Sequence, residues 1–137
     1  MLHMLKLCVG VTEIAHLARF QHERLARTGG NAHITRMTPR RAAEILDGGS
    51  LYWIMAGMIT VRQRILGIEP FVAADGVRRC RIELDPQLVM VAPRPHRPFQ
   101  GWRYFKPQDA PPDLDAGSQA AEMPDSMRRA LGDLGLL

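Results

Sequence analysis

The sequence has few of the features that mark disulfide-bonded or membrane-bound proteins. Two cysteines, Cys8 and Cys80, stand in 137 residues, too few and too far apart for a disulfide framework or a paired-cysteine metal site. Both lie in alternating apolar segments, where a free cysteine behaves as a small core residue. No apolar run approaches the roughly 20 residues that span a bilayer. The first ten residues lack a charged leader and a cleavage site, so they indicate a strand rather than a signal peptide. We therefore expect a cytoplasmic protein without membrane contact.

Catalytic motifs are equally scarce. The sequence has no phosphate-binding P-loop, GxSxG elbow or HExxH helix, and its five histidines show no paired ligand spacing. Four carboxylates border turns or strand ends, where solvation and turn formation explain them: Glu69, Asp75, Glu83 and Asp85. Sixteen of the eighteen cations are arginines, so a lysine nucleophile would have to be Lys6 or Lys106. We expect no metal, no cofactor and a binding protein rather than an enzyme.

The net charge of +4 conceals an asymmetry along the chain. Residues 19–106 carry fifteen Arg and Lys against seven Asp and Glu, whereas residues 107–137 carry two against six. A basic body with an acidic tail suits a nucleic acid or another polyanion as partner. A GC-rich genome, which favours arginine codons, explains the arginine content equally well.

The apolar pattern predicts an α+β domain built on a curled antiparallel sheet. Two helices are expected early in the chain, one after an N-cap at Thr12 and ended by Thr28-Gly29-Gly30, the other over 40–46. The expected strands and β-like segments are 3–11, 33–37, 51–55, 58–68, 79–84, 88–91 and 102–105, with a hairpin turn at Asp75-Gly76. In 58–68, Ile59, Val61 and Gln63 should oppose Thr60, Arg62 and Arg64.

Prolines become frequent after residue 92, which restricts helices and central strands in this part of the chain. Residues 1–109 are expected to form a single α+β domain. Residues 110–137 are expected to be a Pro-rich acidic linker and a short C-terminal helix over 124–134, packed on or near the same domain.

The first candidate site is a basic segment that carries aromatic residues. Single-stranded nucleic acid binds such mixtures, because bases stack on exposed rings while Arg and Lys neutralise phosphates. In a strand, Trp102 and Tyr104 would share one face and Arg103 and Phe105 the other. The competing interpretation makes the rings core residues and the arginines a solvated rim. The candidate residues are Arg94, Arg97, Trp102, Arg103, Tyr104 and Lys106.

A second candidate site combines Tyr52 and Trp53 with Arg62 and Arg64. If the two strands pair, aromatic and guanidinium groups would line one concave surface. The guanidinium fork fits phosphate or carboxylate in two-point fashion. The competing interpretation makes Trp53 a core anchor and lets the arginines cover a sheet edge.

Four blocks of the sequence, LKLCVGV, LDGGSLYW, RQRILGI and RPFQGWRY, resemble a bacterial family catalogued as domain of unknown function 1489. More distantly, a helix ending in Ile-Leu-x-Gly-Gly, an aromatic strand and an Arg-bearing strand resemble the PUA-like superfamily with its ASCH and EVE branches. That resemblance implies a small curled antiparallel β-barrel with two or three flanking helices and a cleft for RNA or a modified base. It would place these residues near the cleft: Tyr52, Trp53, Arg62, Arg64, Trp102 and Arg103.

The leading hypothesis is an accessory module that binds RNA or a modified nucleotide in an Arg/aromatic cleft. One alternative is a small-molecule or modified-nucleotide hydrolase in the same cleft, which would require Lys6 or Glu69 to converge with Thr60. Another is a protein-interaction domain that uses the aromatic segment as its hot spot. The sequence does not determine an oligomeric state.

Overall fold

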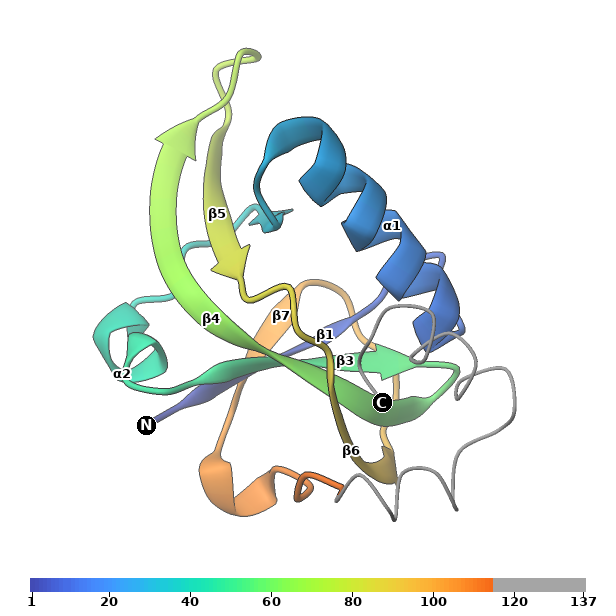
Figure 1. Ribbon diagram of the computed structural model, residues 1–137. Coiled ribbons are helices and arrows are strands. Elements are labelled where there is room, and N and C mark those ends of the chain that lie inside the picture. The colour runs from blue at the N-terminus through green and yellow to red at the C-terminus, as the bar shows by residue number, and fades with distance from the viewer. Residues whose placement is uncertain (115–137) are drawn as a thin grey trace.

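The chain forms an α+β domain with one seven-stranded mixed sheet and two α-helices (Figure 1). The computed structural model describes residues 1–114. In chain order the elements are β1 (His3–Leu7), α1 (Ile14–Thr28), β2 (Ala32–Thr35), α2 (Ala42–Leu46), β3 (Ser50–Met55), β4 (Met58–Val72), β5 (Arg78–Leu84), β6 (Val89–Pro95), β7 (Trp102–Phe105) and the 3₁₀ turn η1 (Pro107–Asp109). The α+β class expected from the sequence is confirmed.

The sheet contains one parallel pair, β1 and β3, and β7 lies on the other side of β1. The strand order is β2-β5-β4-β3-β1-β7, with β6 also paired to β4. All other pairs are antiparallel, so the expected antiparallel sheet is a mixed one. The parallel pair needs a long crossover between its strands, and α1, β2 and α2 supply it.

Strand β4 is long and bent, and it joins the two halves of the sheet (Figure 1). Its first part pairs with β3 and β6, and its second part pairs with β5. The register shifts between Ile59 and Val61 and again between Ile65 and Gly67. A bulge inserts a residue and reverses the side-chain alternation. Ile59 and Val61 therefore lie in different cores, and the expected run of alternating residues through this strand is wrong at that point.

The central strands are buried on both faces, which explains why every residue of β3 is buried. One face packs against α1 and α2 and forms the first core, which includes Met4, Leu51, Trp53, Ile14 and Ile45. The opposite face forms the second core, which consists of Leu5, Tyr52, Ile54, Ile59, Val91 and Phe105. Cys8 and Cys80 are both free and buried in the first core, as expected.

Turn chemistry places most of the boundaries where the sequence predicts them. Helix α1 ends at Gly29, whose φ of 76° needs the left-handed region that glycine tolerates. Asp75 and Gly76 form the turn between β4 and β5, and the Asp75 carboxylate accepts a hydrogen bond from the Val77 amide. At the start of α1 the N-cap is Glu13 rather than Thr12, and no side chain caps this helix end.

The two ends of the strand order, β2 and β7, share no strand pairing within residues 1–114. The expected closure into a barrel is therefore not observed in the described chain. The two edges nevertheless approach each other, because the Trp102 indole nitrogen donates a hydrogen bond of 2.9 Å to the Met37 carbonyl just after β2. We call this opening, between the end of β2 and the start of β7, the seam.

Residues 112–114 run beside β6 and add to the sheet. Val91 and Asp113 form an antiparallel bridge, and the Ala92 amide donates to the Pro112 carbonyl. Arg62 holds the same segment through two bonds of 2.7 and 2.6 Å to the Asp113 carboxylate. The expected helix over 124–134 lies outside the described residues. Within residues 1–114, no helix is long and apolar enough to cross a membrane.

Candidate functional site

A row of three large side chains crosses the three strands at one end of the sheet, β3, β1 and β7. Lys6 on β1 is the direct partner of Trp53 on β3 and of Trp102 on β7. Residues directly opposite one another in neighbouring strands project from the same face, and here that face is the one covered by α1. We call Trp53, Lys6 and Trp102 the Trp–Lys–Trp row.

A hollow of about 310 Å³ opens between α1 and the sheet on the Trp53 side of this row. We call it the α1 hollow. The end of β1 and the loop after it form one wall, and α1 forms another. It is lined by Lys6, Leu7, Cys8, Val9, Gly10, Val11, His16, Leu17, Phe20, Gln21, Arg24, His33 and Trp53.

A second hollow of about 440 Å³ lies in the seam, on the Trp102 side of the row. We call it the seam hollow. Its lining residues are Lys6, Ile34, Thr35, Arg36, Met37, Gln100, Gly101 and Trp102. The hydrogen bond from Trp102 to the Met37 carbonyl fixes the indole ring at this boundary. Lys6 is the one residue that lines both hollows.

The lining of both hollows is cationic and contains no carboxylate. Four arginines of the described chain are paired with acids: Arg41 with Glu44, Arg62 with Asp113, Arg79 with Asp75 and Arg81 with Glu69. Lys6, Arg24 and Arg36 make no ion pair with any described residue, and the same is true of exposed arginines such as Arg64 and Arg97. Cations that are left unpaired around a concave surface raise the local concentration of anions.

Two buried polar atoms in the α1 hollow lining also have no partner within residues 1–114: Arg24 Nε and His33 Nε2. The His33 ring packs edge-on against Trp53 with 5.1 Å between ring centres. Burial, with additional repulsion from Lys6 and then Arg24, lowers the pKa of His33 to about 4. His33 is therefore a neutral imidazole at pH 7 and carries one N–H donor and one bare nitrogen acceptor.

A buried amide network holds Trp53 in position. The Trp53 indole donates a 2.8 Å hydrogen bond to Gln63 Oε1, and Gln63 and Gln21 exchange two hydrogen bonds of 2.9 and 2.6 Å. Gln63 also donates to the Asp85 carbonyl at 2.9 Å, and Gln21 accepts from Asn31. The network ties β3 and β4 to α1, so it fixes the width of the α1 hollow.

The α1 hollow contains one thiol, one lysine and two histidines, Cys8, Lys6, His16 and His33. Burial raises the pKa of the Cys8 thiol to about 11, which makes this cysteine a poor nucleophile. Burial also lowers the pKa of Lys6. Glu69 lies 3.9 Å from Arg81, outside both linings, and Thr60 lines neither hollow. Glu69 and Thr60 thus do not join Lys6 in the lining of either hollow. No group of three or more His, Cys, Asp or Glu side chains suited to a metal ion occurs in the described chain.

The structure divides the candidate residues of the sequence between the two faces of the sheet. Trp53 and Trp102 lie on the hollow side, and Tyr104 lies beside Trp102 with 5.1 Å between ring centres. Tyr52 is buried in the second core on the opposite face, where its direct cross-strand partner is Arg62. The two arginine and aromatic clusters therefore do not meet in one cleft.

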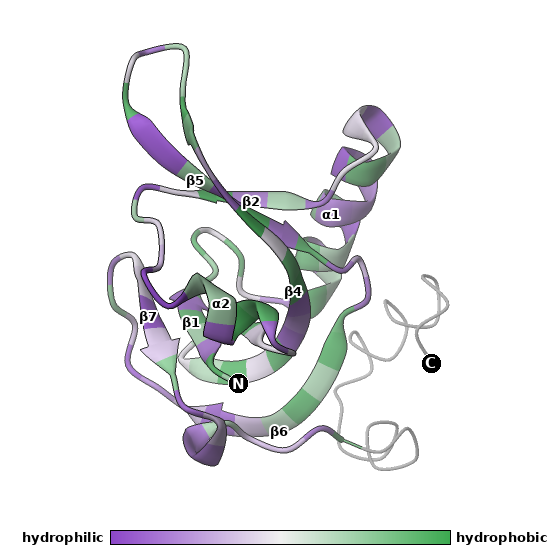
Figure 2. Cartoon of the chain, turned by 90° about the vertical axis from the view of Figure 1, so that its left-hand side faces the viewer, coloured by the Kyte–Doolittle hydropathy of each residue, from purple (hydrophilic) through white to green (hydrophobic). Residues whose placement is uncertain are grey.

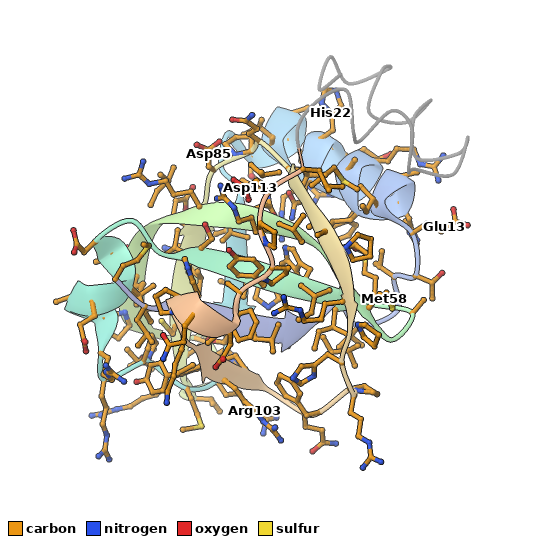
Figure 3. All side chains as sticks on the ribbon, turned by 90° about the horizontal axis from the view of Figure 1, so that it is seen from below. Glu13, His22, Met58, Asp85, Arg103 and Asp113 are labelled. Atoms are coloured by element: carbon orange, nitrogen blue, oxygen red, sulfur yellow. The ribbon has the colours of Figure 1, made fainter. Side chains whose placement is uncertain are left out.

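The remaining candidates lie on the outer surface. Arg103 stacks its guanidinium over the Phe99 ring at 4.1 Å and stands well apart from Asp113, the partner of Arg62 (Figure 3). Arg94 donates a hydrogen bond to the Asp109 carbonyl. Arg64, Arg97 and Lys106 are exposed, and Figure 2 shows hydrophilic colouring over part of β7, in line with its exposed Arg103 and Tyr104.

Sequence reasoning missed the cations that line the hollows. Lys6 stands in an apolar strand and was considered only as a nucleophile, whereas Arg24, His33 and Arg36 were not considered as site residues. The available signal was a lone lysine at an inward-facing position of a strand that is otherwise apolar. Such a side chain is costly to bury without a partner, which marks it as a functional candidate.

Comparison with known proteins identifies the family of this chain. The family described as "Protein of unknown function (DUF1489)" matches residues 4–137. Neither the curated proteins nor the solved structures include a significant match. The match covers nearly the whole chain and agrees with the resemblance carried by the four sequence blocks. The chain belongs to the DUF1489 family of proteins of unknown function.

Proposed function

We propose that the protein binds single-stranded RNA or a modified nucleotide at the Trp–Lys–Trp row. One observation carries the proposal: two hollows that meet at Lys6 are lined by cations and by no carboxylate. A ligand that neutralises the positive charge of these linings must be anionic. It must also have an apolar part, because apolar side chains form much of the two linings.

A nucleotide meets both conditions. Its phosphate would bind Lys6, with Arg24 and Arg36 as further donors on either side, and its base would enter a hollow against indole and aliphatic surface. Each hollow has a volume in the range of small-ligand sites. The exposed arginines outside the row, such as Arg64 and Arg97, would add sequence-independent attraction for the backbone.

The curled sheet and its seam agree with the PUA-like relationship implied by the sequence, and we include that relationship in the proposal. In this interpretation the hollows beside β1 correspond to the ligand cleft that the resemblance implies. The proposed site differs from the site expected from the sequence in its centre and in the role of Arg62. Its centre is Lys6 between Trp53 and Trp102, and Arg62 serves to fasten Asp113.

The two lysines of the chain provide a matched test. We expect Lys6→Gln to weaken binding of an oligouridine of about 10 nucleotides by roughly tenfold, as measured by fluorescence anisotropy at about 50 mM salt. The slope of log affinity against log salt should also fall by about 0.7, the loss of one phosphate contact to a single strand. Lys106→Gln removes the same charge from an exposed position outside the hollows, so it should change affinity much less.

Two results would contradict the proposal. One is the absence of measurable binding by the wild-type protein at low salt. The other is an equal effect of the two substitutions, which would mean that the site contributes only general positive charge.

A protein partner is the second candidate, and one specific observation favours it. Large apolar side chains stand exposed at the rim of the hollows, with Val9 76%, Met37 70% and Phe20 51% exposed. Exposed apolar groups around a concave surface are typical of protein-binding patches. Recovery of a defined protein complex that resists about 1 M salt would favour this function over RNA binding, because screening weakens phosphate contacts.

A further inference from the structure

We propose that the site takes two consecutive nucleotides with their bases splayed apart, one base in each hollow and the linking phosphate at Lys6. This inference depends on the proposed nucleic-acid function and names the ligand unit that the site accepts. The bound ligand would be a dinucleotide step of a single strand, and duplexes and isolated mononucleotides would bind poorly.

The arrangement of the row supports this division into two subsites. Trp53 lines the α1 hollow and not the seam hollow, Trp102 lines the seam hollow and not the α1 hollow, and Lys6 lines both. Lys6 is also the direct partner of each tryptophan across the sheet. A single cation thus separates two hollows, each with its own indole ring.

Strand spacing excludes a stacked pair of bases. Trp53 and Trp102 lie on strands separated by β1, which puts their backbones about 10 Å apart at the usual spacing of neighbouring strands. Stacked bases are separated by about 3.4 Å. Two neighbouring bases can enter the two hollows only when they are unstacked, as in protein-bound single-stranded RNA.

The charge distribution places the linking phosphate at the junction. The Lys6 ammonium group makes no hydrogen bond or ion pair with any residue of the described chain, so it is available to a ligand. On either side, Arg24 belongs to the α1 hollow and Arg36 to the seam hollow. Each hollow therefore has one arginine of its own in addition to the shared lysine, so phosphates on both sides of the dinucleotide step would also find a cation.

The two hollows differ in their polar lining. His33 beside the α1 hollow has an Nε2 without a partner, but this atom is buried. The seam hollow is lined by the exposed side chains of Arg36 and Gln100, while its Thr35 hydroxyl already donates to the Met37 carbonyl.

The two tryptophans allow each hollow to be observed separately. The chain contains only two, so a ¹⁵N-labelled full-length sample gives two indole N–H resonances, one for each hollow. The resonances are assigned with Trp102→Phe, which removes the signal of the less buried ring. The ligands compared are uridine dinucleotide, its uncharged methylphosphonate analogue and uridine monophosphate.

We expect uridine dinucleotide to shift both resonances with one common dissociation constant. Neutralising the linkage should weaken binding by roughly tenfold, the loss of one charge-assisted hydrogen bond. In Lys6→Gln the charged and neutral dinucleotides should bind equally, whereas Lys106→Gln should preserve the difference. An adenine dinucleotide should bind less tightly than the uridine one, since its bases stack more strongly and must be separated.

The outcomes distinguish a failure of the two-subsite inference from a failure of the proposed nucleic-acid function. If long single-stranded RNA binds but uridine dinucleotide moves only one indole resonance, or the neutral linkage binds as well as the charged one, the two-subsite inference is wrong while the function stands. If neither the long RNA nor the dinucleotide moves either resonance, the proposed function itself is wrong. The comparison of linkages on the wild-type protein requires no substitution, so it holds even if Lys6→Gln fails to fold.

Discussion

Gln63 is a buried polar residue whose side chain depends on several hydrogen bonds, and its replacement by leucine should be severely destabilising. The side chain is fully buried on β4 and takes part in four hydrogen bonds. Leucine has a similar volume but can make none of them. The substitution leaves the indole N–H of Trp53, the amide of Gln21 and the carbonyl of Asp85 without their partner.

The magnitude follows from the groups that lose a partner. An unsatisfied buried donor or acceptor costs about 1–3 kcal/mol, and Trp53 and Gln21 are both at most 5% exposed. Transfer of the leucine side chain into the core recovers about 2 kcal/mol. We expect a net loss of about 3 kcal/mol in the free energy of unfolding, or roughly 10 °C in Tm for a domain of this size.

Urea unfolding followed by circular dichroism measures this change directly. Gln87→Leu is the matched control, because Gln87 is exposed just after β5 and its side chain has no part in the network; its effect should stay within about 0.5 kcal/mol. A loss below about 1 kcal/mol for Gln63→Leu would refute the reasoning, since it would mean that the amide network is replaced by water or by other partners at little cost.

Two further predictions concern charge and backbone space. NMR titration should show His33 with a pKa near 4, and Lys6→Gln should raise it, because repulsion from Lys6 contributes to the shift. Since the unfolded chain takes up this proton near pH 6.5 and the folded chain does not, stability should fall by up to about 3 kcal/mol as pH drops from 6.5 to 4; a midpoint above pH 6 would contradict this. Gly49→Ala should cost about 3 kcal/mol or more, because its Cβ would overlap backbone oxygens of Leu2 and Ile45. Gly30→Ala, which meets only an ordinary 3.7 Å contact, is the control, and equal losses in thermal unfolding would refute the steric argument.

Local chemistry determined the parts of the fold that the sequence could predict. Gly29 ends α1 and Asp75-Gly76 forms a hairpin, because both depend on backbone preferences of a few neighbouring residues. The short strand β7 was also predicted, with Trp102 and Phe105 on opposite faces. Each of these features needs no knowledge of a distant partner.

Long-range pairing determined the parts that the sequence could not predict. The bulge that puts Ile59 and Val61 on different faces depends on the pairing of β4 with β6. The burial of both Tyr52 and Trp53 depends on β3 becoming a central strand with a core on each side. The residue pattern within a single strand indicates neither the bulge nor the burial of both aromatic side chains.

The same limit applied to the candidate site. The sequence identified Trp53 and Trp102 but joined them to Arg62, which lies on the other face. Their true neighbour is Lys6, and that contact arises only when β1 inserts between β3 and β7. Residues 47 positions apart in the chain become direct partners through a parallel crossover, and no local signal indicates this register.

A crystal structure of the protein with uridine dinucleotide would test the central claim most directly. The account predicts a phosphate oxygen within hydrogen-bond distance of Lys6 Nζ, about 2.7–3.2 Å, with one base beside Trp53 and the other beside Trp102. A dinucleotide bound instead on the outer surface, along Arg94, Arg103 and Lys106, would contradict it.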